Sequence, residues 1–179
     1  MPEKELSTAD GKLRLIRPDV ARDAPLSVGW LQGEAGRRTQ LLMGNAPQRL
    51  IIPTLATEQE RVRSFLENKQ QRTWAIEYDG QVVGAIWVNL QSDEHLKAPA
   101  IHIMIGDPEA RGKGIGKQAI GLVMRSMRSE KEFRTLYSRH LVDNTAAAAI
   151  LRPYGFQKAG KPYGDADGLQ WQNEVADLT

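Results

Sequence analysis

The sequence contains no cysteine, and that absence excludes several kinds of chemistry. Without cysteine there is no disulfide framework, no thiol nucleophile and no cysteine-ligated metal. Histidine is also scarce, because the chain has only His95, His102 and His140, and their spacing matches no zinc motif. We therefore expect no metal site.

Long hydrophobic runs are missing as well. No apolar segment approaches the ~18 residues that a membrane-spanning helix requires, and the first twelve residues, MPEKELSTADGK, are polar and charged. These features predict a soluble, cytoplasmic protein with no membrane partner. The length of 179 residues suits one domain over residues 1–179, in which residues 1–11 form a flexible tail.

The chain has little excess of charge of either sign. Its 24 Lys and Arg residues against 22 Asp and Glu residues give a net charge of +2, too small to indicate a nucleic-acid or membrane binder. The distribution is uneven, since residues 109–139 hold eight basic residues and three acidic ones. This segment is either a solvated helix face or an anion-binding site. Because the segment contains no recognisable nucleic-acid-binding motif, we expect no nucleic-acid partner.

Hydrophobic periodicity and turn residues predict an alternation of strands and helices. Asp19 is a candidate N-cap, Thr57 opens a second helix, and Asp79-Gly80 suits the tight turn of a hairpin. Asp143 or Asn144 caps a short helix. The expected elements in chain order are a strand at 12–18, helices at 19–32 and 55–71, a hairpin at 72–90, a strand at 98–107, a helix at 114–129, a strand at 133–142, a helix at 145–152, and strands at 154–160 and 168–175.

The strand expected at 98–107 leads through a glycine-rich turn into a helix. Residues in a strand alternate between its two faces, so Ala100, His102 and Met104 share one face while three isoleucines share the other and should face the core. In the turn, glycines stand at positions 112, 114 and 116 where a helix begins. The first N–H groups of a helix have no partner inside it, so this turn predicts a cradle for an anion such as pyrophosphate.

Three phosphate-binding templates compete for this turn. A Walker loop requires G-x-x-x-x-G-K-[ST], but Gly112 to Gly116 is one residue too short and Gln118 follows Lys117. A dinucleotide-binding loop requires a third glycine in register, which is absent. The third template, R/Q-x-x-G-x-G/A after a strand, matches residues 111–116, RGKGIG, completely.

With this motif the sequence resembles the GCN5-related N-acetyltransferases (GNAT), and the order of the expected elements is also the order of that family. The resemblance implies an α/β (α+β) fold with a mixed, mostly antiparallel sheet of six to seven strands and about four helices. A second match is Asn144, an alanine-rich helix, and then Tyr154-Gly155-Phe156. Residues 17–31 and the hairpin's VVGAI are most similar to the branch of ribosomal-protein N-terminal and aminoglycoside 6'-acetyltransferases.

The resemblance implies acetyl-CoA as the cofactor. The main-chain N–H groups of the turn would hold its pyrophosphate, the basic side chains there would add mobile charge, and strand residues would face the pantetheine arm. The cofactor-binding residues expected on this basis are Met104, Ile105, Gly106, Arg111, Gly112, Lys113, Gly114, Ile115, Gly116, Lys117 and Asn144.

The implied reaction is direct transfer of an acetyl group to a primary amine of a small molecule or a protein N-terminus. A main-chain N–H near Met104 or Ile105 would stabilise the oxyanion. The sequence departs from its family where a glutamate is expected, because Ala100 stands there; His102 is the alternative catalytic base, or else a packed histidine. Tyr154 is the candidate catalytic acid, or else a core residue.

Other readings stay open from the sequence alone. The missing glutamate also fits a catalytically weak CoA-binding regulatory or interaction module. Asp93 and Glu94 are either solvated loop residues or contacts for a cationic acceptor. The apolar segment 29–55 would line an acceptor site or a homodimer contact. Specificity for the acceptor in such folds comes from variable loops rather than from the shared motifs.

Overall fold

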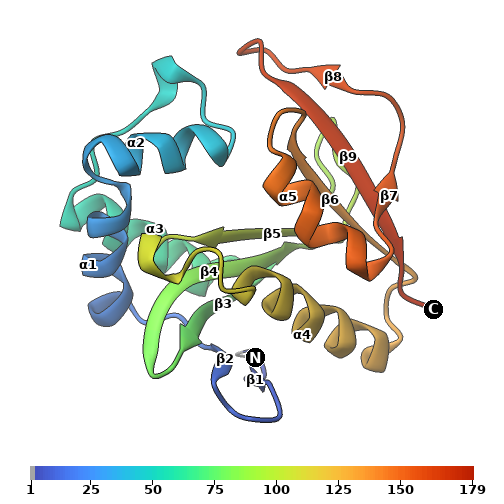
Figure 1. Ribbon diagram of the computed structural model, residues 1–179, viewed down its shortest axis with the longest axis horizontal. Coiled ribbons are helices and arrows are strands. Elements are labelled where there is room, and N and C mark those ends of the chain that lie inside the picture. Colours follow the sequence, from blue (N-terminus) through green and yellow to red (C-terminus); the bar gives the residue numbers. More distant parts are fainter. Residues whose placement is uncertain (1–2) are drawn as a thin grey trace.

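A computed structural model describes residues 3–179, and its centre is one strongly twisted sheet (Figure 1). The strands lie in the order β1-β2-β3-β4-β5-β6-β9-β7, and β8 also pairs with β9. All neighbours are antiparallel except β5 and β6. The bounds are β1 Leu6–Ser7, β2 Leu13–Ile16, β3 Gln71–Tyr78, β4 Gln81–Asn89, β5 Ala100–Ile105, β6 Thr135–Leu141, β7 Gln157–Lys158, β8 Tyr163–Gly164 and β9 Gln170–Asp177.

Five α-helices and three short 3₁₀ turns accompany the sheet. Helices α1 and α3 pack together on one face, whereas α4 lies on the other face, with α5 beside it (Figure 1). The bounds are α1 Val20–Leu31, α2 Gly33–Leu42, η1 Pro47–Arg49, α3 Leu55–Glu67, η2 Pro108–Ala110, α4 Ile115–Glu130, α5 Thr145–Leu151 and η3 Arg152–Tyr154. The predicted α/β class with a mostly antiparallel sheet is confirmed, with nine strands and five α-helices among the described residues.

The main core lies between α4 and the sheet. Helix α4 buries a stripe that includes Ile115, Ala119 and Val123, and these side chains belong to the same cluster as Ile101 of β5. Ile103 and Ile105 pack against that cluster from the same strand face, as alternation requires. The predicted core face of this strand is therefore confirmed, and the opposite face of β5 points towards α1 and α3.

Several expected caps and turns are confirmed. The Asp19 side chain accepts a hydrogen bond from the N–H of Arg22 at the start of α1, and Asn144 caps α5. Asp79 and Gly80 both have positive φ, 48° and 81°, as a tight hairpin turn needs. Helix α3 begins at residue 55 as expected but ends at Glu67 rather than at 71. Its N-cap is Thr54, whose side chain and that of Thr57 form a reciprocal capping box.

The prediction of a flexible tail over residues 1–11 is wrong for the described part; residues 1 and 2 lie outside it. Leu6 pairs with Leu15, so the chain adds strand β1 to the edge of the sheet. The indole N–H of Trp74 donates to the carbonyl of Lys4 at 3.0 Å. These two contacts fix a segment whose composition alone suggested solvent exposure.

Helix α2 and the short strands β1 and β8 are absent from the sequence prediction. Helix α2 begins directly after Gln32, which ends α1, and glycines at positions 33 and 36 weaken its helical signal. Gly36 is needed for this close junction, since a Cβ there would lie 2.0 Å from the carbonyl carbon of Leu31. The two-residue strands β1 and β8 are too short to show periodicity.

Candidate active site

Strands β5 and β6 diverge, and their separation creates the candidate active site. Ala100 with Tyr137 is the single residue pair of their parallel ladder within residues 3–179. Beyond it a cavity of about 290 Å³ opens. It is lined by Leu42, Met43, Trp87, Asn89, His102, Ile103, Ser138, Arg139, His140, Asn144, Ala147, Ile150, Leu151 and Trp171.

The main chain of β5 presents hydrogen-bonding groups to this opening. Gly106 donates its N–H to Val83 of β4, so alternate residues, including Met104, direct their main-chain groups to β4 as well. The main-chain groups of Ile101, Ile103 and Ile105 consequently point to the gap, while their side chains pack in the core. The carbonyl of Ile101 accepts a hydrogen bond from Ser138, and that of Ile105 accepts one from Arg111. The N–H groups of Ile103 and Ile105 remain directed into the opening.

The glycine-rich turn presents a row of unused main-chain donors. Gly112 and Gly114 have φ of 74° and 75°, a region in which other residues are strained, and Gly114 is the N-cap of the 16-residue helix α4. None of the N–H groups from Gly112 to Lys117 has an acceptor among residues 3–179. A Cβ on Gly112 would meet no atom within 4 Å, so the space beside Gly112 is open.

The basic side chains near the turn have two different roles. Lys113 and Lys117 are exposed and form no ion pair with any residue of the described chain. Arg111 is not mobile, contrary to the prediction. Its guanidinium donates to the carbonyl of Ile105 at 3.1 Å and to the hydroxyl of Thr39 at 2.8 Å, so it ties the end of β5 to α2.

Two other predicted cofactor residues serve the scaffold. The N–H of Gly106 is used by Val83, and a Cβ at Gly106 would lie 2.3 Å from the ring of Trp30. Gly116 lies against the β5 face, where a Cβ would be 3.6 Å from Ile103 and 3.7 Å from Ile150. Gly106 therefore offers no free N–H to a ligand, whereas that of Gly116 remains free.

His102 lies in the cavity, on the β5 face that points to α1 and α3. Its ring stacks on Trp87 with 5.6 Å between ring centroids, and its Nε2 atom lies 3.3 Å from Nδ2 of Asn89. Burial, together with the positive charge of Arg139, lowers the pKa of His102 from 6.5 to about 4. The ring is thus neutral at pH 7, and its Nε2 lone pair can accept the Asn89 hydrogen bond.

Tyr154 is not brought into the cavity. Its hydroxyl donates to the carbonyl of Lys117, and its ring end lies over Gly121, where a Cβ would be 2.6 Å from the hydroxyl oxygen. Burial raises the pKa of Tyr154, which keeps the phenol protonated. This position gives Tyr154 a packing role between η3 and α4 and gives the candidate catalytic acid no access to the gap.

Asn144 does line the cavity, and it joins two helices. Its side-chain oxygen accepts from Ala147 at the start of α5, and its amide nitrogen lies 3.4 Å from the carbonyl of Leu42 at the end of α2. Leu42 and Met43 line the same cavity, so the apolar segment 29–55 contributes to the site, as one of its two predicted roles requires.

Sequence reasoning missed the polar residues that β6 adds to the cavity. His140 is buried, with one ring nitrogen 2.8 Å from the carbonyl of Leu141 and the other 3.1 Å from Glu174, so neither nitrogen is free for a ligand. Arg139 lies over the ring of Trp171, with 4.8 Å to its centroid. No motif marks these residues, because each depends on a pairing between distant strands.

Asp93 binds the protein itself rather than presenting a free carboxylate. It accepts hydrogen bonds from the N–H groups of His95 and Leu96 and lies 3.5 Å from Arg139. Burial opposes its ionisation, but these hydrogen bonds and the nearby arginine outweigh burial and lower the pKa of Asp93. The predicted role in holding a cationic acceptor has no support from this geometry.

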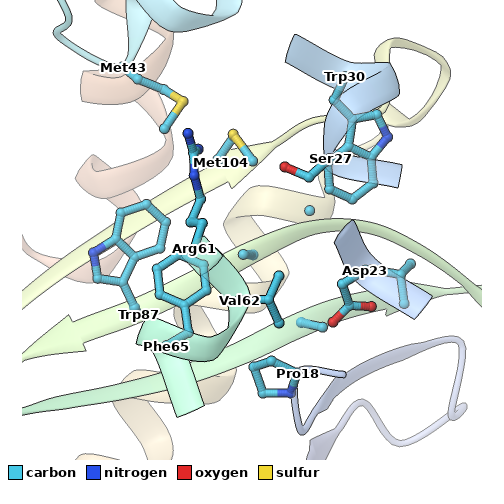
Figure 2. Close-up of a pocket in the computed structure, with 14 residues that line it drawn as sticks. Pro18, Asp23, Ser27, Trp30, Met43, Arg61, Val62, Phe65, Trp87 and Met104 are labelled. Atoms are coloured by element: carbon cyan, nitrogen blue, oxygen red, sulfur yellow. The ribbon is translucent and has the colours of Figure 1, made fainter. Parts of the chain in front are cut away.

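A second, smaller cavity adjoins the first on the α1 and α3 side (Figure 2). Its volume is about 40 Å³, and Met43 and Trp87 line both cavities. Phe65 of α3 stacks on Trp87 with 5.8 Å between centroids, and Trp87 stacks in turn on His102. A row of three rings therefore leads from the smaller cavity to the opening between β5 and β6.

Residues 3–179 contain no group of three or more His, Asp or Glu side chains placed to hold a metal ion. No helix in this part of the chain has both the length and the apolar character that a membrane crossing demands.

Comparison with known proteins shows the family. Residues 12–157 match the acetyltransferase (GNAT) domain. Among solved structures, RimL, the ribosomal L7/L12 alpha-N-protein acetyltransferase in complex with coenzyme A, is 17% identical, with a TM-score of 0.75, over 96% of this chain and 97% of that one.

Two other similar structures carry ligands of the same kind. The microcin C7 self-immunity acetyltransferase MccE, in complex with acetyl-CoA and AMP, is 15% identical, with a TM-score of 0.74, over 93% of this chain and 92% of that one. AAC(6')-Ib, in complex with ribostamycin and coenzyme A, is 19% identical, with a TM-score of 0.70, over 93% and 92%. The match over most of the chain, together with the open N–H groups at α4 and the split between β5 and β6, establishes that this chain belongs to the GNAT family of acetyltransferases.

Proposed function

We propose that this protein is an acetyl-CoA-dependent N-acetyltransferase that acts on a primary amine by direct transfer. The observation that carries the proposal is the row of unused N–H groups from Gly112 to Lys117 at the start of α4. Such a row, at the positive end of a helix dipole, binds a diphosphate without any single dominant side chain. The exposed side chains of Lys113 and Lys117 add positive charge beside this row.

The proposed cofactor site continues from the turn along β5. The pantetheine arm would lie in the gap between β5 and β6, where the N–H groups of Ile103 and Ile105 are directed. Micromolar affinity corresponds to about 8 kcal/mol. Several charge-assisted hydrogen bonds of roughly 1.5–3 kcal/mol each would supply this after the costs of ordering.

In the proposed reaction the bound thioester supplies the acetyl group. The amine nitrogen attacks the carbonyl carbon, the N–H of Ile105 or Ile103 donates to the oxygen that becomes negative, and the carbon–sulfur bond then breaks. The thiolate leaves as the thiol after it takes up a proton, and the amine gives up its proton to water or to His102. His102 is a titratable side chain that lines the cavity, and its ring contacts the uncharged side chains of Asn89 and Trp87.

The low pKa of His102 restricts the kind of amine that can react. An α-amine with a pKa near 8 is roughly one-tenth neutral at pH 7, whereas a lysine-like amine near 10.4 is about one part in 2,500 neutral. A base with a pKa of about 4 takes a proton from either ammonium only against a large free-energy difference. The amine must therefore arrive neutral, which favours an α-amine of a small molecule or of a protein N-terminus.

The structural neighbours include one enzyme for a protein N-terminus and one solved with a small-molecule amine. RimL is named for the α-amine of ribosomal protein L7/L12, and AAC(6')-Ib was solved with ribostamycin.

The second candidate function is a CoA-binding regulatory or interaction module with little turnover. The position of Tyr154 away from the cavity favours it, since no catalytic acid is found there.

Two measurements test the proposal. Titration calorimetry should show micromolar binding of acetyl-CoA, and thiol release should rise when polyamines, aminoglycosides, amino acids or N-terminal peptides are added. Binding without any amine-stimulated release would leave the interaction module as the function. Absence of binding would refute both candidates.

The role of His102 has its own test. On an active amine, His102→Ala should lower kcat about tenfold to a hundredfold, within the range for proton-transfer groups. Asn89→Ala, which removes the neighbouring amide but leaves the ring, is the matched control. Equal kcat and an unchanged pH–rate profile in His102→Ala would show that His102 is only a packed residue.

A further inference from the structure

The smaller cavity next to the proposed active site has three aromatic residues and two methionines among the fourteen residues that line it. Trp30, Phe65 and Trp87 form its walls, with Met43 and Met104 at the side nearer to β5 (Figure 2). It lies between α1, α3 and strands β3 to β5, on the same sheet face as His102. A group attached to an acceptor amine at His102 would reach this cavity along the row of stacked rings.

Most polar side chains of this cavity are already committed. Asp23 accepts hydrogen bonds from the N–H of Asp19 and from the guanidinium of Arg22, and Ser27 donates its hydroxyl to Glu58. Arg61 differs from both. Its guanidinium makes no hydrogen bond with residues 3–179, although its side chain is only 30% exposed.

Glu58 balances the charge of Arg61 without using its donors fully. It is completely buried, and its Oε1 atom lies 3.4 Å from a guanidinium nitrogen of Arg61 but forms no hydrogen bond. Figure 2 shows the Arg61 side chain rising from α3, so that its guanidinium points towards Met43 and Met104. The N–H groups that do not face Glu58 are therefore presented to the cavity and to its junction with the larger one.

A guanidinium in this setting has a preferred partner. Its planar fork of donors matches a carboxylate with two parallel hydrogen bonds, and aromatic walls reduce the competition from water. We propose that Arg61 binds a carboxylate of the acceptor, and that the acceptor is an amine carrying both a carboxylate and an apolar group that packs on Trp87 and Phe65. This inference rests on the proposed function and names its substrate class.

The carboxylate preference can be measured without turnover. The probes are 3-phenylpropionate and its uncharged amide, 3-phenylpropanamide, bound to the full chain in the presence of coenzyme A and followed by calorimetry. The wild-type protein should bind the carboxylate about tenfold to a hundredfold more tightly, as expected for a charge-assisted pair. Equal affinities for the two probes would overturn the proposal.

Variants of Arg61 locate the preference. In Arg61→Gln the ratio of the two affinities should fall to within about threefold, and in Arg61→Lys, which keeps the charge but not the fork, it should be intermediate. Arg63→Gln is the matched control, because Arg63 stands on the same helix but is exposed and paired with Glu60. A preference that survives in Arg61→Gln would overturn the assignment, and the melting temperature and acetyl-CoA affinity of each variant report whether it is folded.

Turnover separates this proposal from the function on which it rests. Acetylation of phenylalanine and of phenylalaninamide is compared as kcat/KM per neutral amine, so that their different amine pKa values do not count. A preference for phenylalanine that Arg61→Gln removes would support the inference. Acetylation of both amines without preference would overturn the inference and leave the proposed function intact. Probe binding that prefers the carboxylate, with no acetylation of any amine, would support the Arg61 site and refute the acetyltransferase function.

Discussion

The two halves of the candidate site are built from different parts of the polypeptide. The half at the start of α4 is made of main-chain N–H groups, which the glycines leave uncovered. The half that faces α1 and α3 is made of side chains, with Trp87, His102 and Arg61 coming from three separate elements. The first half can hold a ligand that is constant throughout a family, whereas the second can change with every substitution, which is how one scaffold serves many acceptors.

The largest expected effect would break the main-chain half. Gly114→Val places a β-branched residue at φ of 75°, at the N-cap position where the row of free N–H groups meets α4. Acetyl-CoA affinity should fall more than about a hundredfold, equivalent to roughly 3 kcal/mol. Calorimetry measures this change. Gly116→Ala is the control, since its Cβ would have ordinary contacts, and tight binding by the valine variant would refute the placement of the diphosphate.

The next effect concerns the side-chain half and its response to acid. The pKa of His102 is about 4 in the folded protein and near 6.5 in the unfolded chain, so below pH 6.5 the unfolded chain binds the proton first. The free energy of unfolding should therefore fall, by at most about 3 kcal/mol, as the pH is lowered from 6.5 to 4. Denaturant unfolding of His102→Asn should show a shallower loss over this range. An identical pH dependence in wild type and variant would contradict the burial of a neutral ring.

Arg111 lies where the two halves meet, and its replacement should affect the stability of the protein more than its affinity for acetyl-CoA. Arg111→Ala removes the hydrogen bonds to Ile105 and Thr39 and should cost about 1–3 kcal/mol of stability. Acetyl-CoA affinity should fall less than about tenfold, because this guanidinium already donates to Ile105, Gly106 and Thr39. Thermal unfolding and calorimetry on the same samples separate the two effects. A large loss of affinity at unchanged stability would show that Arg111 contacts the cofactor directly.

The smallest effect is expected for the exposed cations beside the turn. Lys113→Ala should weaken acetyl-CoA binding about twofold to fivefold, and the difference from wild type should shrink as salt is raised. Thermal stability should not change, because Lys113 has no ion pair in the described chain. A salt-independent loss would indicate a short, buried contact with phosphate instead.

The main-chain half could be predicted from sequence because backbone conformation leaves a local signature. Positive φ at positions 112 and 114 requires glycine, so the spacing RGKGIG encodes the turn directly. The same holds for the Asp79-Gly80 hairpin and for the Asn144 cap. In each of these places the feature depends on residues that are neighbours in the chain.

The side-chain half could not be predicted, because its contacts join residues far apart in the sequence. The strand face of His102 marks it as a candidate, but its stacking on Trp87 and its contact with Asn89 depend on the register of β4 and β5. Arg111 matches its motif but binds Thr39 of α2 instead of standing free beside the turn. Two glycines weaken the helical pattern of α2, so the sequence did not predict that helix. Arg61 gave no signal at all, because its position in a cavity follows only from the packing of α3 on the sheet.

The short strand β1 has a consequence for the behaviour of the protein in concentrated solution. A long strand at the border of a sheet presents unpaired main-chain groups on which a second molecule can add a strand. Here β2 pairs with β3 over four residues, and the outermost strand β1 adds only two residues to the edge of the sheet. The carbonyl of Lys4 is held by Trp74, so little of that border is exposed as a template. A few residues that look dispensable by composition thereby protect this side of the molecule against self-association.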